Sequence, residues 1–205
     1  MQRVERQSRE SKPEKIGNVL RLTAWIGLFA QIGFGAIALL MVVFAIAGRK
    51  FSQATVLPPG VAPGIGADLN RGITPGIGIG IFWAVCGLLA LLVGIYLAFR
   101  QTRFAKRLRH ADTMKHPAKS EVMNVLRLSA IVGLVGMLLT ILGGGATLGI
   151  LFSKAIAQPQ GVAIYNPTRV IRSLDIIVGM ANMSGIAAHF VGTVASLSVF
   201  EWLHR

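Results

Sequence analysis

The sequence predicts an all-α, polytopic membrane protein whose four transmembrane helices form two tandem parallel-repeat hairpins. Three observations predict this fold class. Four long stretches of the chain carry no Asp, Glu, Lys or Arg. A motif that leads into the first stretch returns before the third. The mean hydropathy is +0.63 although the formal net charge is +13, so apolar and basic residues must lie in separate segments.

The uncharged stretches cover residues 23–48, 72–99, 128–153 and 176–200. Each exceeds the roughly 20 residues that a helix needs to cross a ~30 Å hydrocarbon layer. We expect spans at about residues 23–48, 76–99, 128–152 and 174–200. A water-soluble fold is excluded because the chain has too few amphipathic segments to cover four helices that are apolar all round.

The motif that returns is NVLRLTA at residues 18–24, which becomes NVLRLSA at residues 124–130. The match continues through Gly27-Leu28 and Gly133-Leu134 and then fades. A repeat with a basic entrance and an uncharged continuation predicts a duplicated hairpin whose two copies share one orientation.

The segments that flank the first span are expected to be irregular. Residues 1–15 mix Arg, Lys and Glu without periodic apolar positions, which predicts a mobile cytoplasmic arm before a four-helix domain over residues 16–205. Residues 51–74 are rich in Pro and Gly, which excludes regular structure there. Thr74-Pro75 predicts the start of the second helix, as a cap followed by proline in the first turn.

Small residues within the spans predict close helix packing. Gly143, Gly144 and Gly145 in the third span require either close contact with a neighbouring helix or a local helix break, and contact is favoured. Small side chains also recur every four residues in the second and fourth spans, where they allow helix backbones to approach closely in lipid. These stripes are Gly76, Gly80 and Ala84, and Ser184, Ala188, Gly192 and Ser196.

The distribution of basic residues predicts the topology. Most Lys and Arg residues lie in the N-terminal arm and in the connection between the second and third spans, and few lie in the other two loops. The positive-inside rule therefore places both termini and the 100–120 loop in the cytoplasm or its plastid equivalent. Four aromatic residues are expected at that same interface, where amphipathic rings prefer to lie: Trp25, Tyr96, Phe99 and Trp202.

Polar residues inside the spans are the candidate functional residues. The fourth helix is expected to start at Asn166-Pro167, with Arg172 and Asp175 spaced for a local pair. From Asp175 onward, polar residues recur every seven positions and should face the bundle interior: Asp175, Asn182, His189 and Ser196. Counting ~1.5 Å per residue, one polar residue from each helix falls at a similar depth: Gln31, Cys86, Thr140 and His189.

Two interpretations of these residues stay open. In the first, Asp175, Asn182, His189, Gln31 and Thr140 line a pathway for a cation or proton, and His189 is the one candidate metal ligand. In the second, the same side chains only hydrogen-bond between helices. No motif predicts an enzyme, a cofactor or a nucleic-acid site.

The central connection offers a second candidate site, because its basic residues could dock a partner at the cytoplasmic face. The candidate docking residues are Arg103, Lys106, Arg107 and Arg109.

Conspicuous residues in each span also resemble those of a known family. They are Trp25 and Gln31; FWAVCGLLAL at 82–91 with Tyr96, Phe99-Arg100 and Thr102-Arg103; Leu134 to Gly136 with Met137, Leu142-Gly143, Ala146-Thr147 and Gly149; and Leu174-Asp175, His189 to Gly192 and Ser196-Leu197. This set, over roughly residues 16–203, is similar to an uncharacterised four-span membrane family of cyanobacteria and plastids. That family includes a chloroplast inner-envelope protein described both as an iron permease and as a protein-import component.

The resemblance implies a permease-like role in moving a metal cation, with iron as the candidate, across a cyanobacterial inner (plasma) or thylakoid membrane. The alternative is a non-catalytic scaffold or assembly subunit of a protein-translocation or photosynthetic complex. Because four helices enclose little volume, the chain is expected to form a homo-oligomer or to join a larger membrane complex.

Overall fold

The computed structural model describes residues 2–54, 76–108, 118–157 and 171–204, with side chains over 18–48, 76–107, 118–157 and 171–203. Within these ranges the chain forms four helices and no strand: α1 (Gln2–Ala54), α2 (Ile77–Leu108), α3 (Lys119–Ile156) and α4 (Ser173–His204). The predicted all-α fold class is confirmed.

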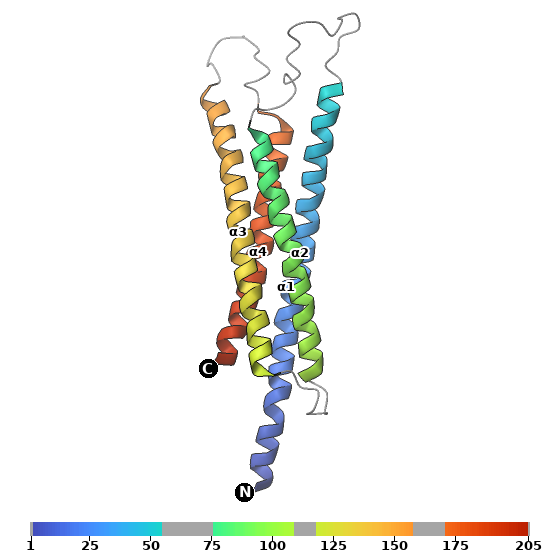
Figure 1. The fold of residues 1–205 in the computed structure, drawn as a ribbon, viewed down its shortest axis with the longest axis vertical. Coiled ribbons are helices and arrows are strands. Elements are labelled where there is room, and N and C mark those ends of the chain that lie inside the picture. Colours follow the sequence, from blue (N-terminus) through green and yellow to red (C-terminus); the bar gives the residue numbers. More distant parts are fainter. Residues whose placement is uncertain (1, 55–75, 109–117, 158–170, 205) are drawn as a thin grey trace, which may run out of the picture.

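The four helices run alternately up and down in one elongated bundle (Figure 1). Helices α1 and α3 each pack against α2 and α4, and α2 also contacts α4 across the bundle. Both chain termini lie at the same end as the end of α2 and the start of α3. We call this the termini-bearing end. The arrangement agrees with the predicted pair of hairpins, each of which enters and leaves at one end.

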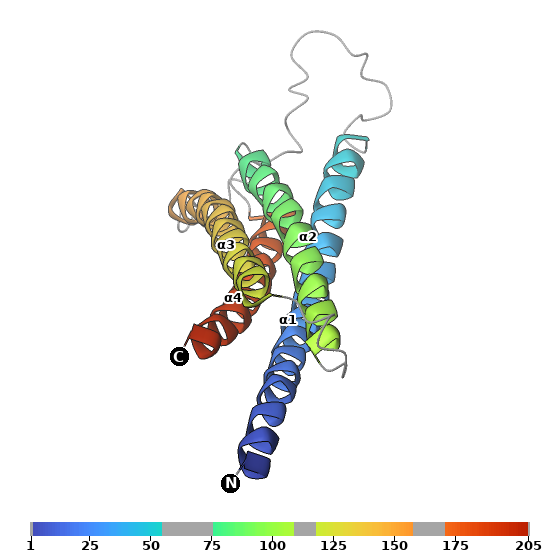
Figure 2. The same ribbon diagram turned by 60° about the horizontal axis from the view of Figure 1, so that its bottom comes forward.

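Helix α1 includes one segment that was expected to be irregular and the first residues of another. The proposed arm over residues 1–15 is helical from Gln2, and α1 continues past Gly48 through Ala54, into the segment expected to be a loop. The N-terminal part of α1 extends well beyond the bundle (Figure 2). Residues 2–15 are rich in Arg, Glu, Gln and Lys, which favour helix, and adding a residue to an existing helix costs far less than starting a new one.

The start of α2 is a glycine turn. Gly76 has φ +87°, a left-handed conformation that glycine adopts without a Cβ penalty, and its carbonyl accepts the Ile79 N–H at 3.0 Å. Thr74-Pro75 and Asn166-Pro167 lie outside the described residues, but the helix starts expected there are wrong. Helix α2 begins at Ile77 after the Gly76 turn, and α4 begins at Ser173 after two residues, 171 and 172, that are not helical.

The outer surface of the bundle is apolar, unlike that of a water-soluble protein, and its interior holds both apolar and polar side chains. Each helix contains a segment long and apolar enough to cross a membrane: Asn18–Gly48, Ile77–Arg107, Lys119–Ile156 and Ser173–Leu203. Large apolar side chains such as Phe29, Leu92 and Phe152 are more than half exposed on the outer surface. An apolar surface of this extent is stable only against lipid, so the chain is an integral membrane protein with four spans.

Apolar clusters close the interior of the bundle. At the termini-bearing end, side chains from all four helices form one cluster: Leu20, Leu97, Phe104, Ala105, Val122, Val125, Leu126 and Val199. Leu20 and Leu126 are equivalent residues of the repeated motif, and both enter this cluster. Their neighbours Arg21 and Arg127 are both exposed. Each copy of the motif thus contributes a leucine to this cluster and an arginine to the surface.

Candidate functional site

The polar stripe of α4 faces the bundle interior, as its spacing predicts. Asp175, Asn182, His189 and Ser196 are each at most 3% exposed. Seven residues advance a helix by about 10.5 Å with little rotation, so the stripe extends along most of the span. Together with the buried polar side chains around it, this stripe forms what we call the polar column. Its other members are Gln31 of α1, Gln101 of α2, Ser129, Thr140, Thr147 and Lys154 of α3, and Thr193 of α4.

An ion pair occupies the column at the end opposite the termini. The Lys154 ammonium lies 2.6 Å from Asp175 Oδ2, and the two side chains are 9% and 2% exposed. The Arg172 backbone N–H also donates to Asp175 Oδ2, at 3.2 Å. Lys154 lies beyond the expected end of the third span at about residue 152, but it does not lie in a loop. It lies in the last turn of α3, which the hairpin brings against the first turn of α4.

Asn182 joins three helices in the next layer of the column. Its Nδ2 donates to the Val178 carbonyl at 3.0 Å and to the Gly80 carbonyl of α2 at 3.3 Å. On α3, Gly143 lies against the Asn182 amide, and a Cβ added there would come within 2.9 Å of the Trp83 Cβ. A side chain at position 143 would therefore force the helices apart.

The three consecutive glycines do not break α3. The helix is continuous through residues 143–145, so the favoured prediction of close contact is confirmed for Gly143 and Gly144, which both approach Asn182. Gly145 instead faces open space on the outside of the bundle.

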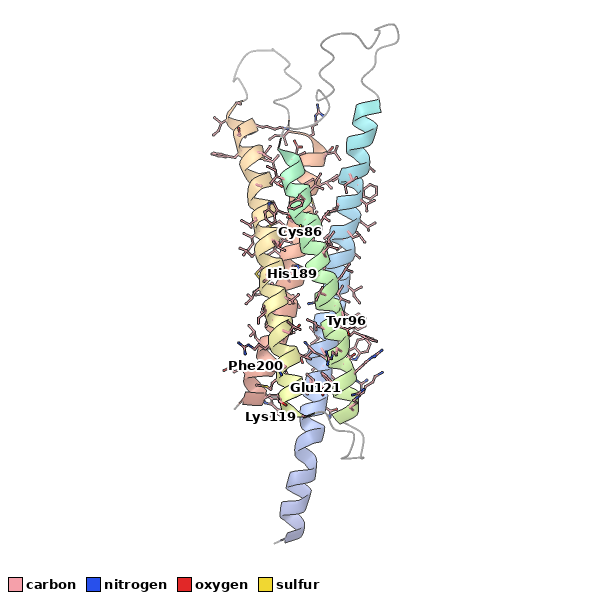
Figure 3. The ribbon with its side chains drawn as sticks, in the orientation of Figure 1. Cys86, Tyr96, Lys119, Glu121, His189 and Phe200 are labelled. Atoms are coloured by element: carbon pink, nitrogen blue, oxygen red, sulfur yellow. The ribbon has the colours of Figure 1, made fainter. Side chains whose placement is uncertain are left out.

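His189 lies in the middle part of the bundle (Figure 3). Its Nε2 is 3.1 Å from the Gly87 carbonyl oxygen of α2, a contact that requires the Nε2–H tautomer. The ring lies directly over Gly136 of α3, where a Cβ would overlap it. Thr140, one turn further along α3, donates its hydroxyl to the Gly136 and Met137 carbonyls. Its methyl group fills the space left by Gly87 and Gly185.

The predicted single layer of Gln31, Cys86, Thr140 and His189 is only partly correct. Thr140 and His189 do meet, at Gly87. Gln31 is buried, but it lies against Gly192, about one turn nearer the termini-bearing end. Cys86 is only partly buried. At this depth α2 turns Gly87 inward, so its backbone carbonyl supplies the polar group expected from Cys86.

Three oxygen atoms in the column are buried without a donor. Within the described part of the chain, Gln31 Oε1, Asn182 Oδ1 and Thr193 Oγ1 have no hydrogen-bond partner. A buried polar atom left in this state costs about 1–3 kcal/mol. Asn182 bonds through its amide nitrogen, and the Gln31 amide packs against Gly192. Both side chains therefore present acceptor oxygens inside a membrane-embedded bundle.

Hydroxyl groups end the column near the termini-bearing end. Ser196 Oγ donates to Ser129 Oγ at 3.0 Å, and Gln101 Nε2 approaches Ser196 Oγ at 3.4 Å. The apolar cluster around Leu20 and Leu126 follows directly and closes this end of the interior.

Five members of the column were not predicted from the sequence: Gln101, Ser129, Thr147, Lys154 and Thr193. A signal for two of them was present. Gly133, Thr140, Thr147 and Lys154 of α3 are spaced by seven, like the α4 stripe. Two heptad stripes on consecutive antiparallel spans predict that the stripes face each other.

Metal ligands are sparse in this site. The described residues contain no group of three or more His, Cys, Asp or Glu side chains that could hold a metal ion. Met180 and Met183 of α4 are exposed and point away from the column. A cation in the column would meet neutral oxygen atoms and the His189 imidazole, a set suited to transient contact and not to tight binding.

The basic docking residues lie elsewhere, at the termini-bearing end of α2. Arg103, Lys106 and Arg107 are exposed there, and Arg109 lies outside the described residues.

These features define a polytopic α-helical membrane protein with four spans and a polar interior. A family model described as "Protein of unknown function (DUF3611)" matches residues 10–204, and the chain belongs to that family. "Protein TIC 21, chloroplastic" of Arabidopsis thaliana is 34% identical over 123 residues, which cover 56% of this chain and 40% of that protein. The chain therefore matches less than half the length of this relative. No solved structure matches the chain. The resemblance to a family of cyanobacterial and plastid membrane proteins is confirmed.

Proposed function

We propose that the protein has a permease-like role and moves a metal cation across its membrane along the polar column. The observation that carries this proposal is the set of three buried oxygen atoms without donors, on Gln31, Asn182 and Thr193. In lipid such atoms are costly, and polar groups within spans mark ion and substrate pathways. Interhelical hydrogen bonding alone leaves these three atoms unexplained, since they make no such bond in the described ranges.

The chemistry of the column fits a divalent metal that binds weakly and moves on. Amide and hydroxyl oxygens with one imidazole suit Fe²⁺ and related ions. We take Fe²⁺ as the first ion to test because the resemblance in sequence includes a protein described as an iron permease. Asp175 is the carboxylate at the end opposite the termini, where its ion pair with Lys154 would have to open to admit a cation.

The apolar cluster at the termini-bearing end must also part for conduction. It closes the interior with Leu20, Leu126 and their neighbours, so the described conformation is a closed one. A four-helix interior packed this closely leaves little room for an ion, which favours a homo-oligomer as the transporting form.

Flux into reconstituted vesicles tests the pathway. The full chain is reconstituted into liposomes that contain a fluorescent chelator whose emission Fe²⁺ quenches. The loss of fluorescence is followed after Fe²⁺ is added outside the liposomes. His189→Ala and Asn182→Leu are expected to abolish uptake, whereas Met183→Leu, on the outer face of α4, should transport like the parent. Circular dichroism and gel filtration check that each variant is folded. Normal uptake by both column variants would refute the pathway.

The orientation of the protein in its membrane belongs to the same proposal. We propose that the termini-bearing end lies on the cytoplasmic side of a cyanobacterial inner or thylakoid membrane, and the basic residues that flank it support this orientation. Tags inserted at Ser8 and Met114 should both be protected from a membrane-impermeant reagent in intact cells. Labelling of one tag and not the other would contradict the two-hairpin topology.

We propose a non-catalytic assembly subunit as the second candidate function. One observation favours it: Gly145 and Gly149 of α3 are four residues apart, exposed, and face open space. On a lipid-facing surface this spacing allows a further helix to approach closely. If this function is correct, purification in mild detergent should yield a complex of fixed stoichiometry that lacks Fe²⁺ uptake. Isolation of the chain with no other protein would count against it.

A further inference from the structure

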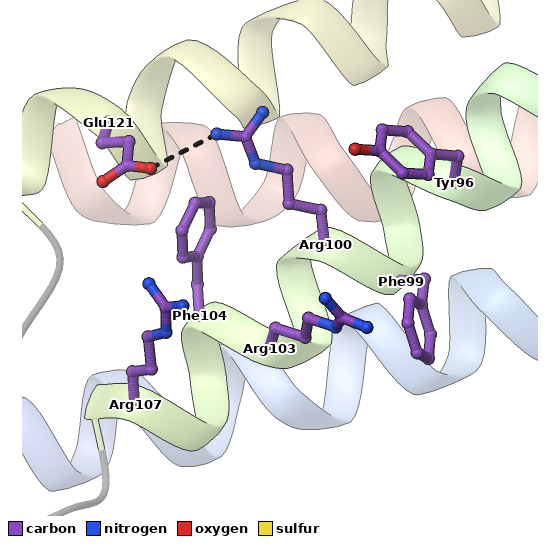
Figure 4. A pocket seen from close by; sticks show the side chains of 7 residues that line it. All are labelled: Tyr96, Phe99, Arg100, Arg103, Phe104, Arg107 and Glu121. Carbon is purple, nitrogen blue, oxygen red and sulfur yellow. Dashed lines mark hydrogen bonds and ion pairs between the residues drawn. The ribbon is translucent and has the colours of Figure 1, made fainter.

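A pocket opens on the outer surface near the termini-bearing end of α2. It has a volume of about 360 Å³ and lies between α2 and the start of α3 (Figure 4). The lining residues are Tyr96, Phe99, Arg100, Arg103, Phe104 and Arg107 of α2 and Glu121 of α3. Six of the seven thus come from one helix, on the side of α2 where it reaches the end of the span.

Positive charge exceeds negative charge in this pocket. Arg100 pairs with Glu121 at 3.3 Å, and both side chains are nearly half exposed. An exposed ion pair contributes little stability and exchanges readily for another anion. Within the described part of the chain, no carboxylate pairs with Arg103 or Arg107. Three guanidinium groups therefore face one carboxylate.

Aromatic rings hold two of these arginines in place. The Arg103 guanidinium lies 4.8 Å from the centre of the Phe99 ring, and that of Arg100 lies 5.5 Å from the centre of the Phe104 ring. Such cation–π contacts orient a guanidinium while leaving its N–H donors available. The Tyr96 hydroxyl is directed toward the side of the pocket that holds Arg100 (Figure 4).

The face of α2 that carries the pocket continues into the membrane as an apolar track. Leu89, Leu92 and Val93 are exposed on this side, about one to two turns before Tyr96. Along one helix face, the surface thus changes from aliphatic to aromatic to guanidinium. This order matches the acyl chain, the interfacial region and the anionic headgroup of a lipid molecule.

We propose that this pocket binds the phosphate headgroup of an anionic membrane lipid, whose acyl chain lies along the apolar track of α2. Arg103 and Arg107 donate to the phosphate oxygens, and Arg100 joins them when Glu121 releases it. A dissolved phosphate would use the same donors but not the track. From the sequence, Arg103 and Arg107 were candidates for docking a partner. Continuity with the lipid-facing surface favours a lipid instead.

Binding of short-chain lipids to the purified full-length protein in neutral detergent tests this site. The probes are dioctanoyl phosphatidylglycerol, dioctanoyl phosphatidylcholine and inorganic phosphate, measured by native mass spectrometry or calorimetry. Phosphatidylglycerol is expected to bind at least about tenfold more tightly than phosphatidylcholine, because the headgroup of phosphatidylglycerol carries a net negative charge that the arginines attract and that of phosphatidylcholine does not. It should also bind at least about tenfold more tightly than inorganic phosphate, which has no acyl chain to lie along the apolar track.

A charge-matched pair of variants separates the pocket from general surface charge. Arg103→Gln/Arg107→Gln should weaken phosphatidylglycerol binding about tenfold or more. Lys106→Gln/Arg127→Gln removes the same charge from exposed positions that do not line the pocket, and should change binding less than threefold.

Four outcomes would overturn the proposal. The first is equal binding of the two lipids, and the second is an equal loss of lipid binding in the two double variants. The third is binding of inorganic phosphate as tight as that of phosphatidylglycerol. The fourth is unchanged lipid binding by Arg103→Gln/Arg107→Gln together with the loss of a co-purifying protein. The third would indicate a site for a soluble anion, and the fourth a protein-docking surface. None of these measurements depends on Fe²⁺ transport.

Discussion

The contact between the His189 ring and Gly136 allows a sharp test of how the polar column is packed. Changing Gly136→Ala would place a Cβ in overlap with the ring, including Nδ1 at 2.6 Å. The ring cannot move away at low cost. It is 1% exposed, and its Nε2 is held at 3.1 Å from the Gly87 carbonyl oxygen.

The expected size of the effect follows from two opposing terms. Overpacking of a well-packed interior costs about 1–3 kcal/mol, and overlap with a buried ring favours the upper part of this range. Replacing glycine by alanine within a helix gains up to about 1 kcal/mol. The net loss in the free energy of unfolding should therefore be about 2 kcal/mol. Gly145→Ala, which meets nothing within 4 Å, should have no such cost and should match or exceed the parent.

A double variant isolates the overlap itself. Removing the ring with His189→Ala should relieve the overlap and leave only the helix gain, so Gly136→Ala should cost about 3 kcal/mol less in that background than in the parent. The free energy of unfolding is measured by titrating SDS into mixed micelles and following circular dichroism. The reasoning fails if Gly136→Ala is as stable as Gly145→Ala, or if the two changes at 136 and 189 add to within about 0.5 kcal/mol.

Two further predictions concern the ends and the exterior of the bundle. Lys154→Met should lower the free energy of unfolding by about 3 kcal/mol, because Asp175 loses a buried ionic partner. The double variant Lys154→Met/Asp175→Leu should lose clearly less free energy of unfolding. Equal losses in the two variants, measured by the same SDS titration, would show that the pair is not coupled. Gly145→Leu/Gly149→Leu should shift the mass of the detergent complex toward the monomer in light scattering, while Gly33→Leu, which also faces open space on α1, should leave it unchanged. An unaltered mass in the double variant would exclude this face of α3 as an oligomer contact.

The repeat and the inward stripe of α4 show how far sequence alone could predict the structure. Backbone groups in lipid must bond within their own helix, so uncharged windows longer than 20 residues predicted the four spans. The charge bias predicted that both termini would share one end. The seven-residue spacing from Asp175 to Ser196 predicted which face of α4 is buried, because neighbours two helical turns apart share one face.

Contacts between helices required the tertiary structure. The burial of Lys154 and its pairing with Asp175 depend on how far α3 extends before the chain turns, which hydropathy does not report. The inward position of the Gly87 carbonyl in place of Cys86 depends on the rotation of α2 about its axis. Which polar side chain lies against a given glycine, such as His189 against Gly136, depends on how the partner helix is placed.

The sequence by itself thus determined the number of spans, the common end of the termini and the buried face of α4, because lipid imposes these through local composition and period. The tertiary structure decided the axial register and rotation of the helices, and with them the polar column and the basic pocket of α2. These depend on side-chain packing between segments distant in the chain, where differences of a few ångströms determine which polar atoms meet.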